Sequence, residues 1–209
     1  MKKPKPYHHG NLQAALLESA ISLIAEVGPA GFTLREVARR AGVSHNAPYR
    51  HFRDKDELLA RVAAQGYKEL GKAMTDAAAR QASALDALRE AGLAYVSFAL
   101  RRPEHFTVMF DAPLSKDSYP EAAEASEHAF SVLVLLVKDC QEKGQIPAGD
   151  QLDFALLAWT MVHGVAKLAI TQRLPYRSKS RILTFTRFVI DESLPLGDRK
   201  DRPLKDRPV

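Results

Sequence analysis

The side chains best suited to a chemical role are polar and basic groups gathered between residues 33 and 55. Arginine and asparagine present paired hydrogen-bonding groups that match the edges of guanine and adenine, which favours Arg35 and Asn46 as base contacts. Hydroxyl and ammonium groups suit phosphate oxygens. The candidates for phosphates are Thr33, Tyr49 and Lys55, those for base edges are Arg35, Ser44, His45, Asn46 and Arg50, and His51 could serve a phosphate or the structure.

Two short helices joined by a tight turn would present these side chains together. Thr33 is placed to cap the first helix, with Glu36 three residues later as in a capping box. Gly42 supplies the permissive backbone that a helix end needs. Ser44 is a second N-cap and opens a helix through Phe52. The sequence therefore predicts a helix-turn-helix that reads DNA.

This stretch resembles the DNA-binding motif of the tetracycline-repressor (TetR) family of transcription regulators. The resemblance is carried by Thr33, Val37, Ala38, Gly42, Val43, Ser44, Tyr49, His51, Phe52, Lys55 and Leu58. Pro48 departs from the family pattern, which usually has an apolar residue there, and Asn46 stands where Gly is common. The resemblance implies a regulator of transcription that is bound to DNA and released when a ligand changes the spacing of two DNA-binding heads.

The charge distribution supports a polyanionic partner for the N-terminal part alone. Residues 1–53 hold eight Lys and Arg against three Asp and Glu, whereas residues 54–197 hold seventeen against nineteen. A basic third on a near-neutral body is typical of a nucleic-acid-binding segment. We expect double-stranded operator DNA as the partner.

Helical periodicity continues along the chain without an alternating strand pattern, so we predict an all-α fold of about nine helices. The expected parts are a basic flexible arm at 1–9, a DNA-binding domain at 10–56 extended by a connecting helix at 54–81, a C-terminal effector-binding and dimerisation domain at 83–194, and a disordered charged tail at 195–209.

A second motif lies in the most apolar segment. Trp159 and His163 are four residues apart and share a helical face, and Gly164 follows in mid-helix. A glycine there costs roughly 1 kcal/mol relative to alanine, so close approach of another helix is its expected reason. The motif resembles the Trp-His-Gly signature of one TetR subgroup, which implies a ligand- and dimer-forming domain. A buried, hydrogen-bonded core role for His163 is the alternative to a ligand contact.

A largely apolar set of side chains is expected to line an effector site: Phe98, Phe106, Met109, Phe110, Phe130, Leu133, Trp159 and His163. A pocket of this kind favours a small hydrophobic or aromatic effector that His163 would orient. No cluster of Arg or Lys is evident on these faces, which argues against a highly charged anion. The same residues could equally form a plain core.

The last two helices carry more apolar surface than one chain's core needs, which predicts a homodimer matched to a palindromic site. The expected interface residues are Met161, Gly164, Val165, Leu168, Phe185, Phe188 and Val189.

The sequence offers no catalytic constellation and no cofactor loop. It has a single cysteine, Cys140, and no paired ligands for zinc. The longest apolar run, 154–170, contains His163 and Lys167 and is short for a bilayer span, so a buried helix in a cytoplasmic protein is expected. Two alternatives to an effector-released repressor remain: a constitutive DNA binder, and a helical enzyme or carrier.

Overall fold

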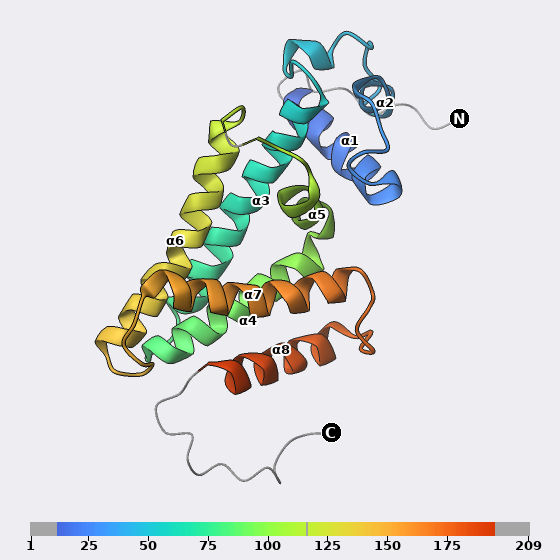
Figure 1. Cartoon of the computed structure of the whole chain (residues 1–209). Helices are drawn as coiled ribbons and strands as arrows, with labels where there is room; N and C mark the ends of the chain where they lie inside the picture. Colours follow the sequence, from blue (N-terminus) through green and yellow to red (C-terminus); the bar gives the residue numbers. More distant parts are fainter. Residues whose placement is uncertain (1–11, 116, 195–209) are drawn as a thin grey trace. The chain divides into compact units, whose positions relative to one another are not determined.

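A computed structural model describes residues 12–115 and 117–194, so the predicted arm and tail lie outside the described residues. The described residues form eight α-helices and one short 3₁₀ helix, with no strand among them, which confirms the all-α prediction (Figure 1). The helices are α1 (Leu12–Val27), α2 (Leu34–Arg40), η1 (Pro48–Arg50), α3 (Lys55–Ala78), α4 (Ala84–Arg101), α5 (Pro103–Asp111), α6 (Pro120–Glu142), α7 (Gln151–Ile170) and α8 (Lys179–Ser193).

The described chain forms two compact units. The first unit joins residues 12–67 to residues 102–126, and the second joins residues 68–101 to residues 127–194. The helix-turn-helix region therefore packs together with α5 and the start of α6, which are distant in sequence. This division differs from the sequence-based boundary near residue 82, and the functional domain limits remain a prediction.

In the first unit, α5 lies directly on α3. A Cβ atom at Gly66 would come within 2.5 Å of the Met109 sulfur, so only glycine leaves room for this approach. The Tyr67 hydroxyl donates a hydrogen bond of 2.7 Å to the Met109 carbonyl. Burial raises the pKa of the Tyr67 phenol, so the hydroxyl keeps its proton and remains a donor at neutral pH.

In the second unit, α4 packs against both α7 and α8. A Cβ atom at Gly92 would lie 2.8 Å from Ile190 of α8 and 3.3 Å from Val162 of α7, so the three helices meet closely at this glycine. The Arg89 side chain reaches from α4 to Asp191 of α8 at 2.8 Å. This contact fixes the position of α8 along α4.

Helices α7 and α8 of the second unit begin at side chains that cap them. The Asp150 carboxylate accepts the N–H groups of Leu152 and Asp153 at 2.7 and 3.1 Å, and α7 starts there. The Ser178 hydroxyl accepts the N–H of Arg181 at 3.2 Å and starts α8. Such caps satisfy amide groups that have no partner inside the helix.

Helix α7 is less buried than the sequence suggested. By length and composition it is the one described helix that could cross a membrane, yet only 33% of its most apolar window is buried inside the structure. One face packs on α4, while Leu152, Leu156, Leu157 and Leu168 are exposed. The prediction of a buried helix is thus met on one side of α7 only, because α4 and α8 leave its other side uncovered.

Candidate nucleic-acid interface

Helix α2 begins at the predicted capping box. The Glu36 carboxylate accepts the backbone N–H and the hydroxyl of Thr33 at 2.8 and 2.9 Å, and the Glu36 N–H donates back to the Thr33 hydroxyl at 3.3 Å. These hydrogen bonds hold the pKa of Glu36 below its ordinary value. A phosphate contact at Thr33 would compete with Glu36 for the same donors.

The turn after α2 is a Schellman motif centred on Gly42. The Gly42 N–H donates to the Arg39 carbonyl at 3.2 Å, and the Val43 N–H donates to the Ala38 carbonyl at 3.0 Å. Gly42 has φ of 71°, in the left-handed region that glycine adopts without steric cost. The prediction of a glycine-ended first helix is confirmed.

The second helix of the motif differs from the prediction. An α-helix was expected from Ser44 to Phe52, but only Pro48–Arg50 is helical, and it is a 3₁₀ turn. Pro48 has no N–H to donate to the Ser44 carbonyl, and its ring crowds that carbonyl. The Ser44 carbonyl instead accepts the Ala47 N–H at 2.9 Å. The hydrogen bonds from Ala47 to His51 are therefore of the tighter i to i+3 type.

Most of the predicted DNA-contacting side chains are exposed in the first unit. Arg35, Ser44, His45, Asn46, Tyr49 and Arg50 all face solvent, as does Thr33, while His51 and Lys55 are partly buried. Two buried side chains hold this segment in the first unit: Phe52, which is 1% exposed, and Pro48. Exposed polar groups on a fixed backbone are what base and phosphate contacts require.

Lys55, a predicted phosphate contact, also has partners within the protein. Its ammonium group donates to the Ala30 carbonyl at 3.2 Å and lies 5.4 Å from the centre of the Phe32 ring. These contacts position the charge beside the loop that precedes α2. An ammonium group has three donors, so a phosphate contact remains compatible with them.

Among the arginines of the first unit's helix-turn-helix region, Arg35, Arg39 and Arg50 form no ion pair with any described residue. By contrast, Arg40 makes paired 2.6 Å hydrogen bonds to the Glu26 carboxylate and so joins α2 to α1. Arg39 was not among the predicted contacts. Its position four residues after Arg35 on the exposed side of α2 was the sequence signal for it.

The predicted effector-lining residues divide between the two units. Phe106, Met109 and Phe110 belong to the first unit, where the Phe106 and Phe110 rings lie 4.8 Å apart and Phe106 is fully buried. Phe98, Phe130, Leu133, Trp159 and His163 belong to the second unit. Within the first unit, the three residues pack as core beside α3.

In the second unit, Trp159 and His163 share a partner that the sequence analysis did not single out. The Trp159 indole N–H donates to the Tyr95 hydroxyl at 3.1 Å, and that hydroxyl lies 2.9 Å from His163 Nδ1. Phe130 packs edge-on against Trp159 at 6.0 Å. The Trp-His pair is therefore tied to α4 by hydrogen bonds, as in the core role considered for His163.

Among the residues that the structure describes, no group of three or more His, Cys, Asp or Glu side chains is placed to hold a metal ion. The candidate site is thus one of surface donors rather than of metal or acid–base chemistry.

Comparison with known proteins places these features in a family. Residues 16–62 match the model described as "Bacterial regulatory proteins, tetR family", and residues 88–191 match "Tetracyclin repressor-like, C-terminal domain". The HTH-type transcriptional repressor Rv3405c of Mycobacterium tuberculosis is 38% identical over 61 residues, which are 29% of this chain and 32% of that protein. The chain thus spans about a third of the length of the curated relatives it matches.

Two solved structures share the fold over nearly the whole chain. A protein of unknown function from Rhodococcus sp. RHA1 is 33% identical, with a TM-score of 0.78 over 92% of this chain and 100% of that one. FadR from Bacillus subtilis, solved in complex with stearoyl-CoA, is 15% identical, with a TM-score of 0.74 over 87% of this chain and 97% of that one.

A capped first helix, a Schellman turn and an exposed polar segment define a helix-turn-helix protein, and the helices that follow form a regulator's C-terminal domain. The chain belongs to the TetR family of bacterial regulatory proteins. The matched family models describe regulators and not enzymes, so the helical enzyme or carrier considered above is set aside.

Proposed function

We propose that this protein is a cytoplasmic transcriptional repressor that binds a palindromic operator as a homodimer and is released by a small, largely apolar effector. The observation that carries the DNA-binding role is the exposed polar segment 44–50, held between a Schellman turn and buried Phe52. The name of the repressor Rv3405c supports repression rather than activation.

The uncovered side of α7 supports the homodimer. A Cβ atom at Gly164 would have no neighbour within 4 Å among the described residues, so none of their contacts requires a glycine in mid-helix. Exposed Leu157 lies two turns before Gly164 and exposed Leu168 one turn after it, on the same side of the helix. A second α7 approaching at Gly164 would bury these leucines and explain the glycine. On α8, the stacked pair Phe185 and Phe188 is only half-buried.

The interior of the second unit supports an apolar effector. Phe130 and Trp159 lie side by side, and His163 is adjacent to Trp159 with ring centres 5.6 Å apart. The proposal includes membership of the TetR subgroup that carries the Trp-His-Gly signature. The complex of the FadR structure with stearoyl-CoA is a property of that protein, but it indicates that the fold accommodates a long apolar chain. A constitutive regulator without an effector is the alternative.

Selection of bound fragments from a random DNA pool tests the proposal. The expected result is one enriched palindromic motif that the full chain binds as a dimer. A library of apolar compounds is then screened for release of that duplex, with the emission of Trp159, the single tryptophan, as the reporter. Absence of any enriched motif would contradict DNA reading. A motif that no compound releases would favour the constitutive alternative.

A further inference from the structure

A groove in the second unit runs between three helices and holds about 900 Å³. Each helix contributes residues spaced three or four apart, so each presents a single side to the groove. The lining residues are Ala73, Asp76, Ala77 and Arg80 from α3 and the turn after it, Glu90, Leu93, Ala94, Ser97 and Arg101 from α4, and Lys179, Ser180, Leu183, Thr184 and Arg187 from α8.

The charges along this groove are unbalanced. Four cationic side chains face two carboxylates, and both carboxylates are already paired: Asp76 with Lys72 at 2.7 Å, and Glu90 with Arg187 at 2.7 Å. Arg80, Arg101 and Lys179 form no hydrogen bond or ion pair with the described residues. The groove therefore carries positive charge that the described chain does not neutralise.

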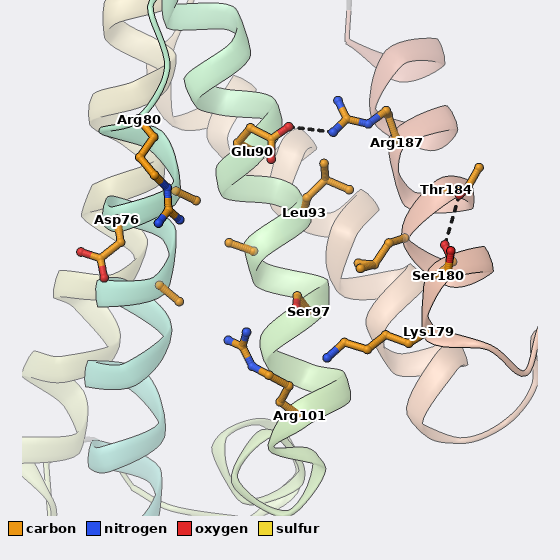
Figure 2. Close-up of a pocket in the computed structure, with 14 residues that line it drawn as sticks. Asp76, Arg80, Glu90, Leu93, Ser97, Arg101, Lys179, Ser180, Thr184 and Arg187 are labelled. Atoms are coloured by element: carbon orange, nitrogen blue, oxygen red, sulfur yellow. Dashed lines mark hydrogen bonds and ion pairs between the residues drawn. The ribbon is translucent and has the colours of Figure 1, made fainter.

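The two ends of the groove differ. Figure 2 shows Arg101, Lys179 and Ser97 together at one end, and the Glu90–Arg187 ion pair at the other. The end with Arg101 and Lys179 presents two cations and a hydroxyl, with no carboxylate beside them. Guanidinium and ammonium groups that line the same end of a groove suit a carboxylate or phosphate, because charge-assisted hydrogen bonds are stronger than neutral ones.

The floor between the two ends is apolar. Leu93 and Ala94 of α4 face Leu183 of α8, and Ala73 and Ala77 add small side chains from α3. The Thr184 hydroxyl donates to the Ser180 carbonyl at 3.1 Å, so its hydrogen is already engaged within α8. A ligand lying along the groove would thus meet cations at one end and hydrocarbon beyond them.

We propose that this groove binds a small amphipathic oxyanion, with its carboxylate or phosphate held by Arg101 and Lys179 and its apolar portion lying on Leu93, Ala94 and Leu183. The site is separate from the proposed apolar effector site, and its binding is measurable without DNA. The sequence argued against a highly charged anion only at the predicted aromatic effector site. The proposed groove revises that expectation, because it would bind a charged ligand elsewhere in the second unit.

Calorimetric titration of the full chain with decanoate, decyl phosphate, decanol and inorganic phosphate, each below any micelle concentration, tests this proposal. Decanoate and decyl phosphate should both bind, and their relative affinity identifies the preferred oxyanion. Decanol and inorganic phosphate should each bind at least about tenfold more weakly, because decanol lacks the anionic group and inorganic phosphate lacks the hydrocarbon chain. Equal binding of decanol would overturn the role of the cations, and equal binding of inorganic phosphate would overturn the role of the apolar floor.

Variants locate the site. Arg101→Gln with Lys179→Gln should weaken the preferred decyl compound at least about tenfold and flatten its salt dependence, because both cations are lost. Arg173→Gln with Lys138→Gln removes the same charge from exposed positions outside the groove and should leave affinity unchanged. Equal affinity in the two double variants would overturn the proposal. A change of oligomeric state in Arg101→Gln with Lys179→Gln, but not in the control, would also overturn the proposal. The two cations would then bind a second copy of the chain rather than a small ligand.

Discussion

The Tyr95 hydroxyl lies 2.9 Å from His163 Nδ1, and this contact joins α4 to α7. The same hydroxyl accepts the Trp159 indole N–H at 3.1 Å. The Tyr95 hydroxyl therefore contacts both members of the Trp159–His163 pair and links them to α4.

Removal of the Tyr95 hydroxyl should destabilise the second unit. Tyr95 is 4% exposed, so Tyr95→Phe removes a buried hydroxyl that both Trp159 and His163 contact. The expected loss is about 1–3 kcal/mol of unfolding free energy, measured by urea denaturation. Tyr176→Phe is the matched control, because Tyr176 is half-buried and makes ring contacts rather than a described hydrogen bond. Equal effects of the two changes would contradict the hydrogen-bonded chain.

Gly164→Leu should weaken the proposed dimer without unfolding the chain. A Cβ atom at position 164 has no neighbour within 4 Å among the described residues, and leucine favours a helix more than glycine does. Sedimentation equilibrium should show dimer dissociation constants raised at least about tenfold, with unchanged helicity by circular dichroism. Thr75→Leu adds a similar side chain on the exposed side of α3 and should leave the dimer intact. A dimer of unchanged strength in Gly164→Leu would place the interface elsewhere.

Glu57 should contribute stability that acid removes. Its carboxylate accepts the Arg53 backbone N–H at 2.9 Å and the Arg53 Nε at 3.0 Å. The backbone hydrogen bond is the main cause that holds the Glu57 pKa below 4.5. A lowered folded-state pKa means that the contribution is present at neutral pH and is lost as the pH falls below the unfolded-state value. Unfolding free energies of the wild type and Glu57→Gln should therefore converge in acid, and a constant difference would contradict this account.

Arg39 should contact operator phosphate. It is exposed on α2 and forms no ion pair with the described residues, so its charge is available to DNA. Arg39→Gln should weaken all duplexes about equally and reduce the slope of log affinity against log salt by about one. Arg173→Gln, which changes an exposed charge in the second unit, serves as the control and should leave the slope unchanged. An unchanged slope in Arg39→Gln would remove it from the interface.

Local signals in the sequence predicted much of this structure. The cap at Thr33 and the end of α2 at Gly42 depend on residues within one turn of each other, and both are confirmed. The helix from Ser44 was wrong because the cost of Pro48 was underestimated. The proline removes one hydrogen bond and also crowds the carbonyl of residue 44, which shifts the segment to a 3₁₀ turn.

Features that depend on three helices meeting could not be predicted. Arg101 and Lys179 are 78 positions apart in the chain, and only the packing of α8 on α4 brings them to one groove. The role of Tyr95 was missed for the same reason, because its partner His163 lies 68 positions away. Sequence periodicity indicates which side of a helix is apolar but not which other helix covers it.

The segment from Ser44 to Arg50 is proposed to read base sequence, and substitution of Asn46 is the sharpest test of that role. Affinities of the wild type and Asn46→Ala are measured for the selected operator and for duplexes changed at one base pair at a time. An asparagine pairs with adenine through two hydrogen bonds, so Asn46→Ala should lose about 1–3 kcal/mol of discrimination at one position in each half-site and keep it elsewhere. If Asn46→Ala keeps the full sequence preference of the wild type, the proposed reading face is contradicted.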